Sequence, residues 1–224
     1  MLELNLDFLF LLKGLLLFLL ALALLLFRKF SRTSVMPWLA AYLFLSGAHS
    51  WLHMCTLGMQ PVAWVDISLN LTQIAAWFLL SIAAAEVLHS RFPAWKIRFW
   101  PSLPVLLSVP LLVPQLASLH AAIHWVAGGF SVVLACIAFC FFSPLHERFK
   151  NLLRLVLVFI LLPAISSVLY PFAQTCTSCS LHSAVSFWTE ALEVFSLLAA
   201  FITLHVFFVQ ISRIHPPGSA QIKN

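Results

Sequence analysis

Apolar runs of bilayer-spanning length recur along the whole chain, and they constrain its fold more than any other feature. A hydrocarbon core about 30 Å thick needs roughly 20 apolar residues, because an α-helix rises about 1.5 Å per residue. Runs of that order occupy residues 7–27, 37–57, 65–88, 100–116, 119–142, 152–172 and 185–209. Backbone groups inside hydrocarbon must bond within their own segment, and runs without alternating polarity favour helices over barrel strands. We therefore expect an all-α polytopic membrane protein, a seven-transmembrane helix bundle surrounded by the lipid bilayer.

The low charge content indicates the same solvent. Charged residues make up 8% of the 224-residue chain and hydrophobic residues 62%, whereas a soluble domain carries about 25% charged residues. The 12 Lys and Arg and 7 Asp and Glu cannot cover a soluble fold of this length with polar surface. The basic residues fall in short clusters between the runs, so we expect no nucleic-acid partner. Residues 1–212 are expected to form one transmembrane domain and residues 213–224 a short cytoplasmic tail.

Lys and Arg follow every second apolar run, and this alternation predicts the orientation of the chain. Short loops rich in Lys and Arg stay in the cytoplasm. The clusters after the first, third, fifth and seventh runs are Arg28, Lys29 and Arg32, then Arg91, Lys96 and Arg98, then Arg148, Lys150 and Arg154, then Arg213 and Lys223. The N-terminus is therefore expected outside and the C-terminus inside. Prolines interrupt the fourth run, which must nevertheless cross the membrane if the alternation is to hold.

Most polar side chains within the runs fall in the half of the membrane that faces away from the cytoplasm. An ionisable side chain inside a bilayer is costly, so it usually faces the bundle interior or a water-filled cavity and has a partner. The polar residues of this outer half are Asp7, Lys13, His49, His53, Asp66, Asn70, Gln73, His120, His124, Glu190 and Glu193. We therefore expect a polar cavity between helices that opens outward.

Two histidine pairs, His49 with His53 and His120 with His124, are spaced four residues apart, which puts both rings of each pair on one helix face. His53 and His124 are expected at similar depth, so they could hold a transition metal ion or a haem between two helices. A polar ligand-binding or proton-sensing cavity fits the same residues, because histidine changes its charge near neutral pH. Hydrogen bonding between neighbouring helices, with no further role, is the third interpretation.

Glu190 and Glu193 are three residues apart on one face of the last predicted helix. We expect them to pair with Lys13, the one Lys within a predicted span, or with the histidines. The alternative is a single buried ion pair, with the second carboxylate reaching the membrane interface.

The sequence Cys-Thr-Ser-Cys at 176–179 lies in a predicted outer loop, where disulfides can persist. Cys176 and Cys179 are therefore candidates for a disulfide, or they remain two free thiols. A disulfide that closes so short a ring is strained and easily reduced, which leaves a redox role open. Together with His182 these cysteines offer three soft ligands, one fewer than a closed tetrahedral zinc site needs.

Several motifs typical of catalytic sites do not occur in the sequence. It contains no GxSxG elbow, no glycine-rich phosphate loop and no HExxH pair. We therefore expect no enzyme activity.

The first two runs resemble a known family in a few particular residues. These are a glycine in a leucine-rich first run, the basic break at 27–30, Trp38 to Ala41, and the stretch Ser46, Gly47, Ala48, His49, Ser50, Trp51 and Leu52. The pattern resembles the seven-helix N-terminal sensory region of bacterial histidine kinases and diguanylate cyclases, whose second helix commonly carries a Gly-Leu-His-Glu-Trp type motif. Ser50 stands where that motif has an acidic residue. The resemblance implies an input domain in the bacterial inner (plasma) membrane, read out by an output module on a separate protein or on a segment beyond this sequence.

The expected function is therefore that of a membrane-embedded sensor or regulatory input module. It would bind a small ligand or protons in the outward-facing cavity and signal to a cytoplasmic partner or within a homo-oligomer. The candidates for ligand binding are His49, Trp51, His53, Asp66, His120, His124, Glu190 and Glu193. The alternative is a haem- or metal-binding redox or metal-handling protein with His53 and His124 as ligands. A small transporter would be expected to show paired broken helices in its two halves, and the proline-rich fourth run has no such counterpart.

Overall fold

The computed structural model describes residues 2–31, 34–56, 63–93, 99–109, 120–142, 154–166 and 179–214, and the regular structure within these ranges is helical. The helices are α1 (Leu2–Ser31), α2 (Val35–Thr56), α3 (Ala63–Arg91), α4 (Ser102–Ser108), α5 (His120–Phe141) and α7 (Cys179–Ile214). A further apolar helix occupies Arg154–Ser166. The expected all-α fold class is confirmed.

Within the described part of the chain, three helical stretches are long and apolar enough to cross a membrane: Leu6–Arg28, Trp64–Arg91 and Phe187–Val209. Val126–Phe141 and Arg154–Ser166 are apolar but shorter. Helix α2 has 22 residues, but its apolar content is lowered by Tyr42, Ser46, His49 and His53. Membrane association is therefore supported by the length and composition of the helices.

The structure describes one short helix within the fourth apolar run. This helix, α4, has seven residues, Ser102–Ser108, whereas the sequence predicts a span over 100–116, of which 110–116 lie outside the described residues. Pro104 is accommodated in the first turn, where the backbone N–H groups have no partner within the helix. Helix α4 packs against α3 and α5.

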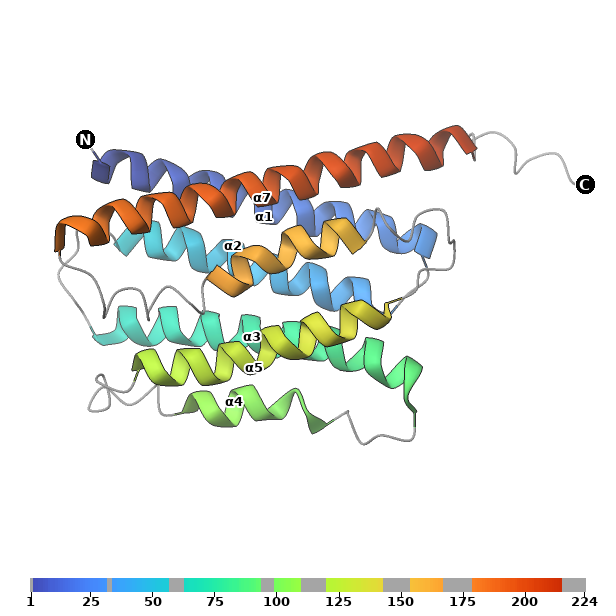
Figure 1. The fold of residues 1–224 in the computed structure, drawn as a ribbon, viewed down its shortest axis with the longest axis horizontal. Helices are drawn as coiled ribbons and strands as arrows, with labels where there is room; N and C mark the ends of the chain where they lie inside the picture. Colours follow the sequence, from blue (N-terminus) through green and yellow to red (C-terminus); the bar gives the residue numbers. More distant parts are fainter. Residues whose placement is uncertain are drawn as a thin grey trace, which may run out of the picture.

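The helices lie side by side along the long axis of the molecule (Figure 1). Helix α1 contacts α2 and α7, α2 contacts α3, and α3 contacts α5. The C-terminal ends of α1, α3, α5 and α7 all lie at the right-hand end in Figure 1. Arg28 and Arg91 stand near the ends of α1 and α3, and Arg154 begins the next helix at that same end. The described members of the basic clusters therefore gather at one end of the bundle.

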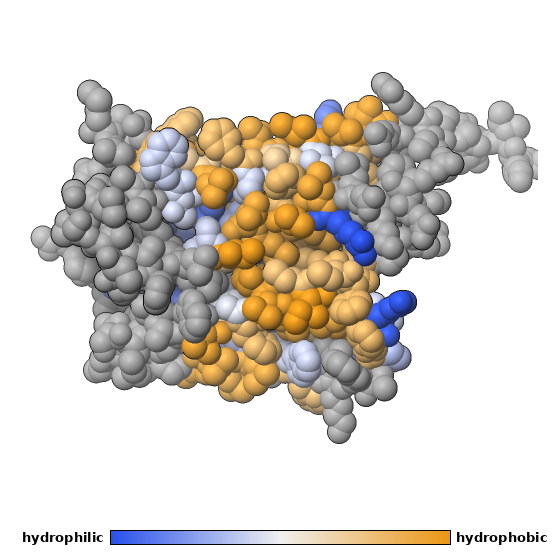
Figure 2. Space-filling view, in the orientation of Figure 1, coloured by the Kyte–Doolittle hydropathy of each residue, from blue (hydrophilic) through white to orange (hydrophobic). Residues whose placement is uncertain are grey.

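Polarity is inverted relative to a soluble protein, with large apolar side chains outside and several polar ones inside. The side chains of Trp188, Leu192 and Phe195 on α7 are between 62% and 70% exposed. On the opposite face of α7, Glu190, Glu193 and Leu197 are buried, at spacings that put them on one helix face. Figure 2 shows the same pattern as an apolar surface over the middle of the visible face. A large exposed apolar surface of this kind is typical of contact with the hydrocarbon core of a membrane.

Small residues allow the inner helices to approach closely. Ala83 and Ala84 on α3 and Ala135 and Ala138 on α5 are fully buried. Small side chains at helix contacts are the usual means of tight packing inside membranes, where no hydrophobic force draws helices together.

Candidate functional site

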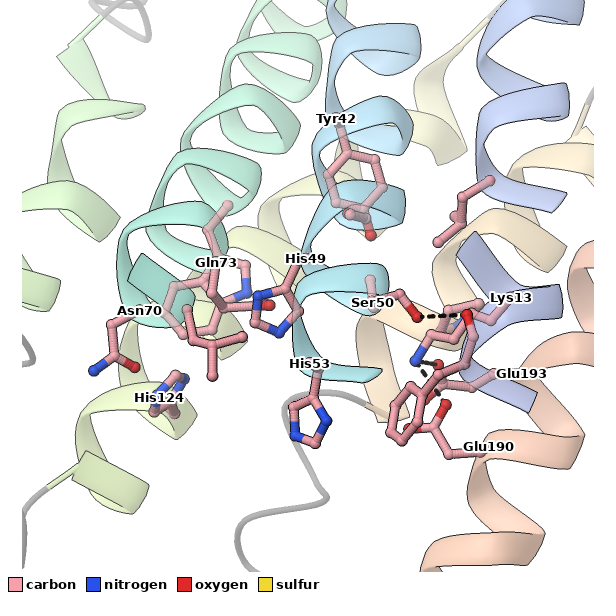
Figure 3. Close-up of a pocket in the computed structure, with 17 residues that line it drawn as sticks. Lys13, Tyr42, His49, Ser50, His53, Asn70, Gln73, His124, Glu190 and Glu193 are labelled. Carbon is pink, nitrogen blue, oxygen red and sulfur yellow. Dashed lines mark hydrogen bonds and ion pairs between the residues drawn. The ribbon is translucent and has the colours of Figure 1, made fainter. Parts of the chain in front are cut away.

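A cavity of about 290 Å³ opens among α1, α2, α3, α5, the helix Arg154–Ser166 and α7 (Figure 3). Its polar lining comprises Lys13, Tyr42, Ser46, His49, Ser50, His53, Asn70, Gln73, His124, Glu190 and Glu193. His53 lies near the C-terminal end of α2, and Asn70 and His124 lie near the N-terminal ends of α3 and α5. These ends are opposite to the basic end of the bundle (Figure 1). The cavity therefore lies toward the end that carries no described basic cluster.

An ion cluster joins the first and last helices at one side of the cavity. Lys13 Nζ on α1 donates to Glu190 Oε2 on α7 at 2.9 Å and also pairs with Glu193 Oε2. Both glutamates are buried, with 7% and 3% of their surface exposed. The expected pairing of the glutamates with Lys13 is confirmed. The alternative, a second carboxylate that reaches the interface, is wrong because Glu193 is the more buried of the two.

The hydrogen bonds around Thr72 hold the His49 ring and favour the neutral tautomer that carries its proton on Nδ1. His49 Nδ1 lies 2.9 Å from Thr72 Oγ1, and the Thr72 hydroxyl donates its one proton to the carbonyl oxygen of Leu69 at 2.8 Å. With that proton used, Thr72 Oγ1 is left to accept from His49 Nδ1–H, since a hydroxyl has a single proton to donate. The neutral ring then carries its free lone pair on Nε2, which can accept a hydrogen bond.

His53 and His124 are held by aromatic contacts. The His53 ring stacks on Phe10 with centroids 4.8 Å apart, and the ring of His124 meets Trp77 edge to face at 5.1 Å. The His49 and His53 centroids are 6.4 Å apart. His53 Nδ1 is buried and has no hydrogen-bond partner within the described part of the chain. A polar group bound in the cavity would supply the missing hydrogen-bond partner of this nitrogen.

The predicted metal or haem site, with His53 and His124 as its two ligands, stays a prediction. Among the described residues no group of three or more His, Cys, Asp or Glu side chains is arranged to hold a metal ion. His53 and His124, the predicted metal ligands, both line the cavity.

The structure brings together five of the eight residues predicted to bind ligand, namely His49, His53, His124, Glu190 and Glu193. Asp66 is exposed in the first turn of α3 and is not part of the cavity lining. His120 begins α5, but its side chain lies outside the described residues, as do Cys176 and the side chain of Cys179.

Trp51 lies against α1 and not in the cavity lining. Its Nε1 donates to the carbonyl oxygen of Leu11 at 3.2 Å, and its ring meets Phe18 edge to face at 4.7 Å. A Cβ on Gly14 would lie 2.2 Å from the Trp51 ring, and a Cβ on Gly47 would lie 3.1 Å from the Gly14 carbonyl oxygen. The two glycines therefore allow α1 and α2 to pack closely, and the Trp51 ring lies directly over Gly14.

Several lining residues were not among the sequence-based ligand-binding candidates. Lys13 was expected only as a partner of the glutamates, and Asn70, Gln73 and Trp77 supply the α3 side of the cavity. Their spacings of three and four residues put these α3 side chains on one helix face, which is the signal that would have found them. Ser50, the residue at the acidic position of the family motif, donates to the carbonyl oxygen of Phe10 at 3.2 Å and is buried.

Comparison with known proteins does not assign the chain to a class. No protein-family model, no curated protein and no solved structure matches it. The function proposed below is therefore drawn from the site and its position in the fold.

Proposed function

We propose that the chain is a multi-pass protein of the bacterial inner membrane and acts as a sensor or regulatory input module. In this proposal a small polar ligand or protons bind in the intramembrane cavity, which opens outward, and the bound state is passed to a cytoplasmic partner or within a homo-oligomer. The proposal treats the chain as a binding module and not as an enzyme. The observation that carries it is the cavity of about 290 Å³ with three histidines and an ion cluster in its lining.

The seven-span topology, with the N-terminus outside, draws on three observations. Three of the described helices have the length and composition to cross a membrane. The described members of the basic clusters gather at one end of the bundle (Figure 1), as cytoplasmic loops require. The exposed side chains of α7, on the outer surface of the bundle, include large apolar ones, as contact with lipid requires.

The cavity has the size and chemistry of a site for a small ligand. Ligand pockets usually measure about 300–1,000 Å³ and combine an apolar lining with a few converging polar groups. Here Phe10, Leu17, Leu69 and Trp77 supply apolar walls beside the polar groups. The volume is at the lower limit of that range, so the ligand is expected to be small.

Helix α7 offers a route from the cavity to the cytoplasmic side. It carries Glu190 and Glu193 near the cavity and continues to Ile214. Its 36 residues extend about 54 Å at about 1.5 Å per residue. A ligand that rearranges the contact of Lys13 with the two glutamates would shift α7 against α1, and a rigid helix would carry that shift to its far end.

The proposal is tested by ligand-dependent stability. Protein in lipid nanodiscs is unfolded by heat across a panel of small polar compounds and across pH, as wild type and as the double variant His49→Ala, His124→Ala. We expect at least one condition to stabilise the wild type, because a ligand that binds only the folded state raises its stability. The double variant should lose this response, whereas the control His205→Ala, an exposed position on α7, should keep it. A double variant that folds and responds like the wild type would contradict the proposal.

The metal or haem alternative has its own measurement. Metal content and the visible spectrum are recorded for the purified protein, oxidised and reduced. A Soret band or stoichiometric transition metal that is lost in His53→Ala and His124→Ala would replace the sensor proposal with that alternative.

A further inference from the structure

We propose that the ligand of the cavity is a small organic cation, an alkylammonium-type group that docks beside Glu190 and Glu193. This inference rests on the proposed function and names the chemical class of its ligand. It follows from the charge count of the ion cluster, from the direction of the remaining hydrogen bonds and from the size of the cavity.

The ion cluster has one carboxylate more than it has ammonium groups. Lys13 pairs with both Glu190 and Glu193, and among the described residues that line the cavity it is the only Lys or Arg. With all three groups ionised the cluster carries one net negative charge. An uncompensated charge in a low-dielectric interior is costly, so the site favours one additional positive charge.

Two further polar groups of the lining, His49 and Ser50, are arranged to accept hydrogen bonds. His49 uses its Nδ1–H toward Thr72 and keeps the Nε2 lone pair. Ser50 uses its hydroxyl proton toward the carbonyl oxygen of Phe10, which leaves its oxygen lone pairs. An ammonium group has only donors, so it complements these two acceptors as well as the two carboxylates.

Aromatic faces and volume fit the same class. Phe10 already has the Lys13 ammonium 5.8 Å from its ring centroid, and Trp77 on α3 also lines the cavity. Aromatic rings attract cations through their negative faces, and the attraction grows when water is excluded. A space of about 290 Å³ admits a short alkylammonium ion. Such an ion can place its charge at the glutamates and its carbon atoms against the apolar lining residues, which include Phe10 and Trp77.

The test compares ligands of two or three carbon atoms that differ in charge. Ethylammonium, propanol and propionate are titrated against the full chain in nanodiscs, and binding is measured by thermal stabilisation and by calorimetry. We expect ethylammonium to bind and the other two to give no shift at the same concentration.

Three variants separate the contribution of charge from that of folding. Glu193→Gln keeps the Lys13 and Glu190 pair but removes the net negative charge, so ethylammonium affinity should fall at least about tenfold. The double variant Glu193→Gln, Lys13→Met has the net charge of the wild type again and should recover binding. Glu86→Gln, whose carboxylate accepts a hydrogen bond from Ser34 outside this cavity, is the control and should bind as the wild type does.

The outcomes distinguish this inference from the function on which it rests. Binding of propanol or propionate that depends on His49 and His124 would overturn the cationic class but leave a ligand-binding module. Stabilisation by acid alone, with no effect of ethylammonium at any pH, would assign the extra positive charge to a proton and overturn the inference. Equal binding of ethylammonium by the wild type and a folded Glu193→Gln variant would overturn it as well.

Discussion

Replacement of Lys13 by methionine isolates the energy of the buried ion cluster. Methionine keeps a similar length but removes the ammonium group that pairs with Glu190 and Glu193. Removing one partner of a buried ion pair costs about 3–5 kcal/mol, because the remaining charge is left without compensation. Lys13 and Glu190 keep 15% and 10% of their side-chain surface exposed, so water screens part of the charge. We therefore expect the lower value, about 3 kcal/mol of unfolding free energy.

A triple variant, Lys13→Met with Glu190→Gln and Glu193→Gln, should recover most of this loss. It removes all three charges, and a neutral replacement of a buried ion cluster is often as stable as the original. We expect the triple variant to lie within about 1 kcal/mol of the wild type. The single variant should also become less destabilised as the pH falls, because protonation of the two unpaired carboxylates removes their charge.

The assay is reversible unfolding in mixed micelles with increasing denaturing detergent, at about pH 8 and about pH 5, which bracket the range of maximal stability for most proteins. The expected order at the higher pH is wild type and triple variant together, with Lys13→Met well below them. The reasoning is refuted if Lys13→Met is as stable as the wild type at the higher pH, or if the triple variant is no more stable than the single one.

Three further substitutions follow from particular contacts. Gly14→Leu should destabilise the protein by about 1–3 kcal/mol, because its Cβ would lie 2.2 Å from the Trp51 ring; thermal unfolding measures this, and an unchanged midpoint would contradict the close contact. Thr72→Val removes the acceptor of His49 Nδ1–H and should cost about 1 kcal/mol and weaken ligand binding, whereas Thr72→Ser should leave both unchanged in the same titration. Phe195→Lys puts a charge on a side chain that is 67% exposed. A Lys at the centre of a span costs about 2.5–3.5 kcal/mol of insertion free energy, so the membrane-inserted fraction of this variant should fall. Full insertion would argue against lipid contact.

The positions of the helices could be predicted from the sequence because hydropathy is a local property. The apolar runs at 7–27 and 185–209 lie within α1 (Leu2–Ser31) and α7 (Cys179–Ile214). The helices continue beyond the runs because the hydrogen bonds of a helix can continue past the edge of the hydrocarbon core. In the fourth run the described helix, α4, covers Ser102–Ser108, and residues 110–116 of that run lie outside the described part of the chain.

The candidate site was predicted in part, because depth in a span can be read from sequence but rotation about the helix axis is harder to infer. His49 and His53 were placed in the cavity by their polarity, and both line it. Trp51 is two residues from each of them, a spacing that does not share a helix face, and it lies against α1. The choice of Lys13 as the partner of the glutamates depends on the packing of α1 against α7, which no local pattern contains.

Accessibility of the cavity to a charged reagent tests the central claim most directly. In a variant without the five native cysteines, Gln73→Cys is exposed in intact cells to membrane-impermeant thiosulfonates, one cationic and one anionic, with Phe195→Cys on the apolar face as the control. A polar cavity that opens outward and favours cations predicts modification of residue 73 from outside, faster by the cationic reagent, and none at residue 195. Modification from the cytoplasmic side alone, or equal resistance of both positions to both reagents, would contradict the account.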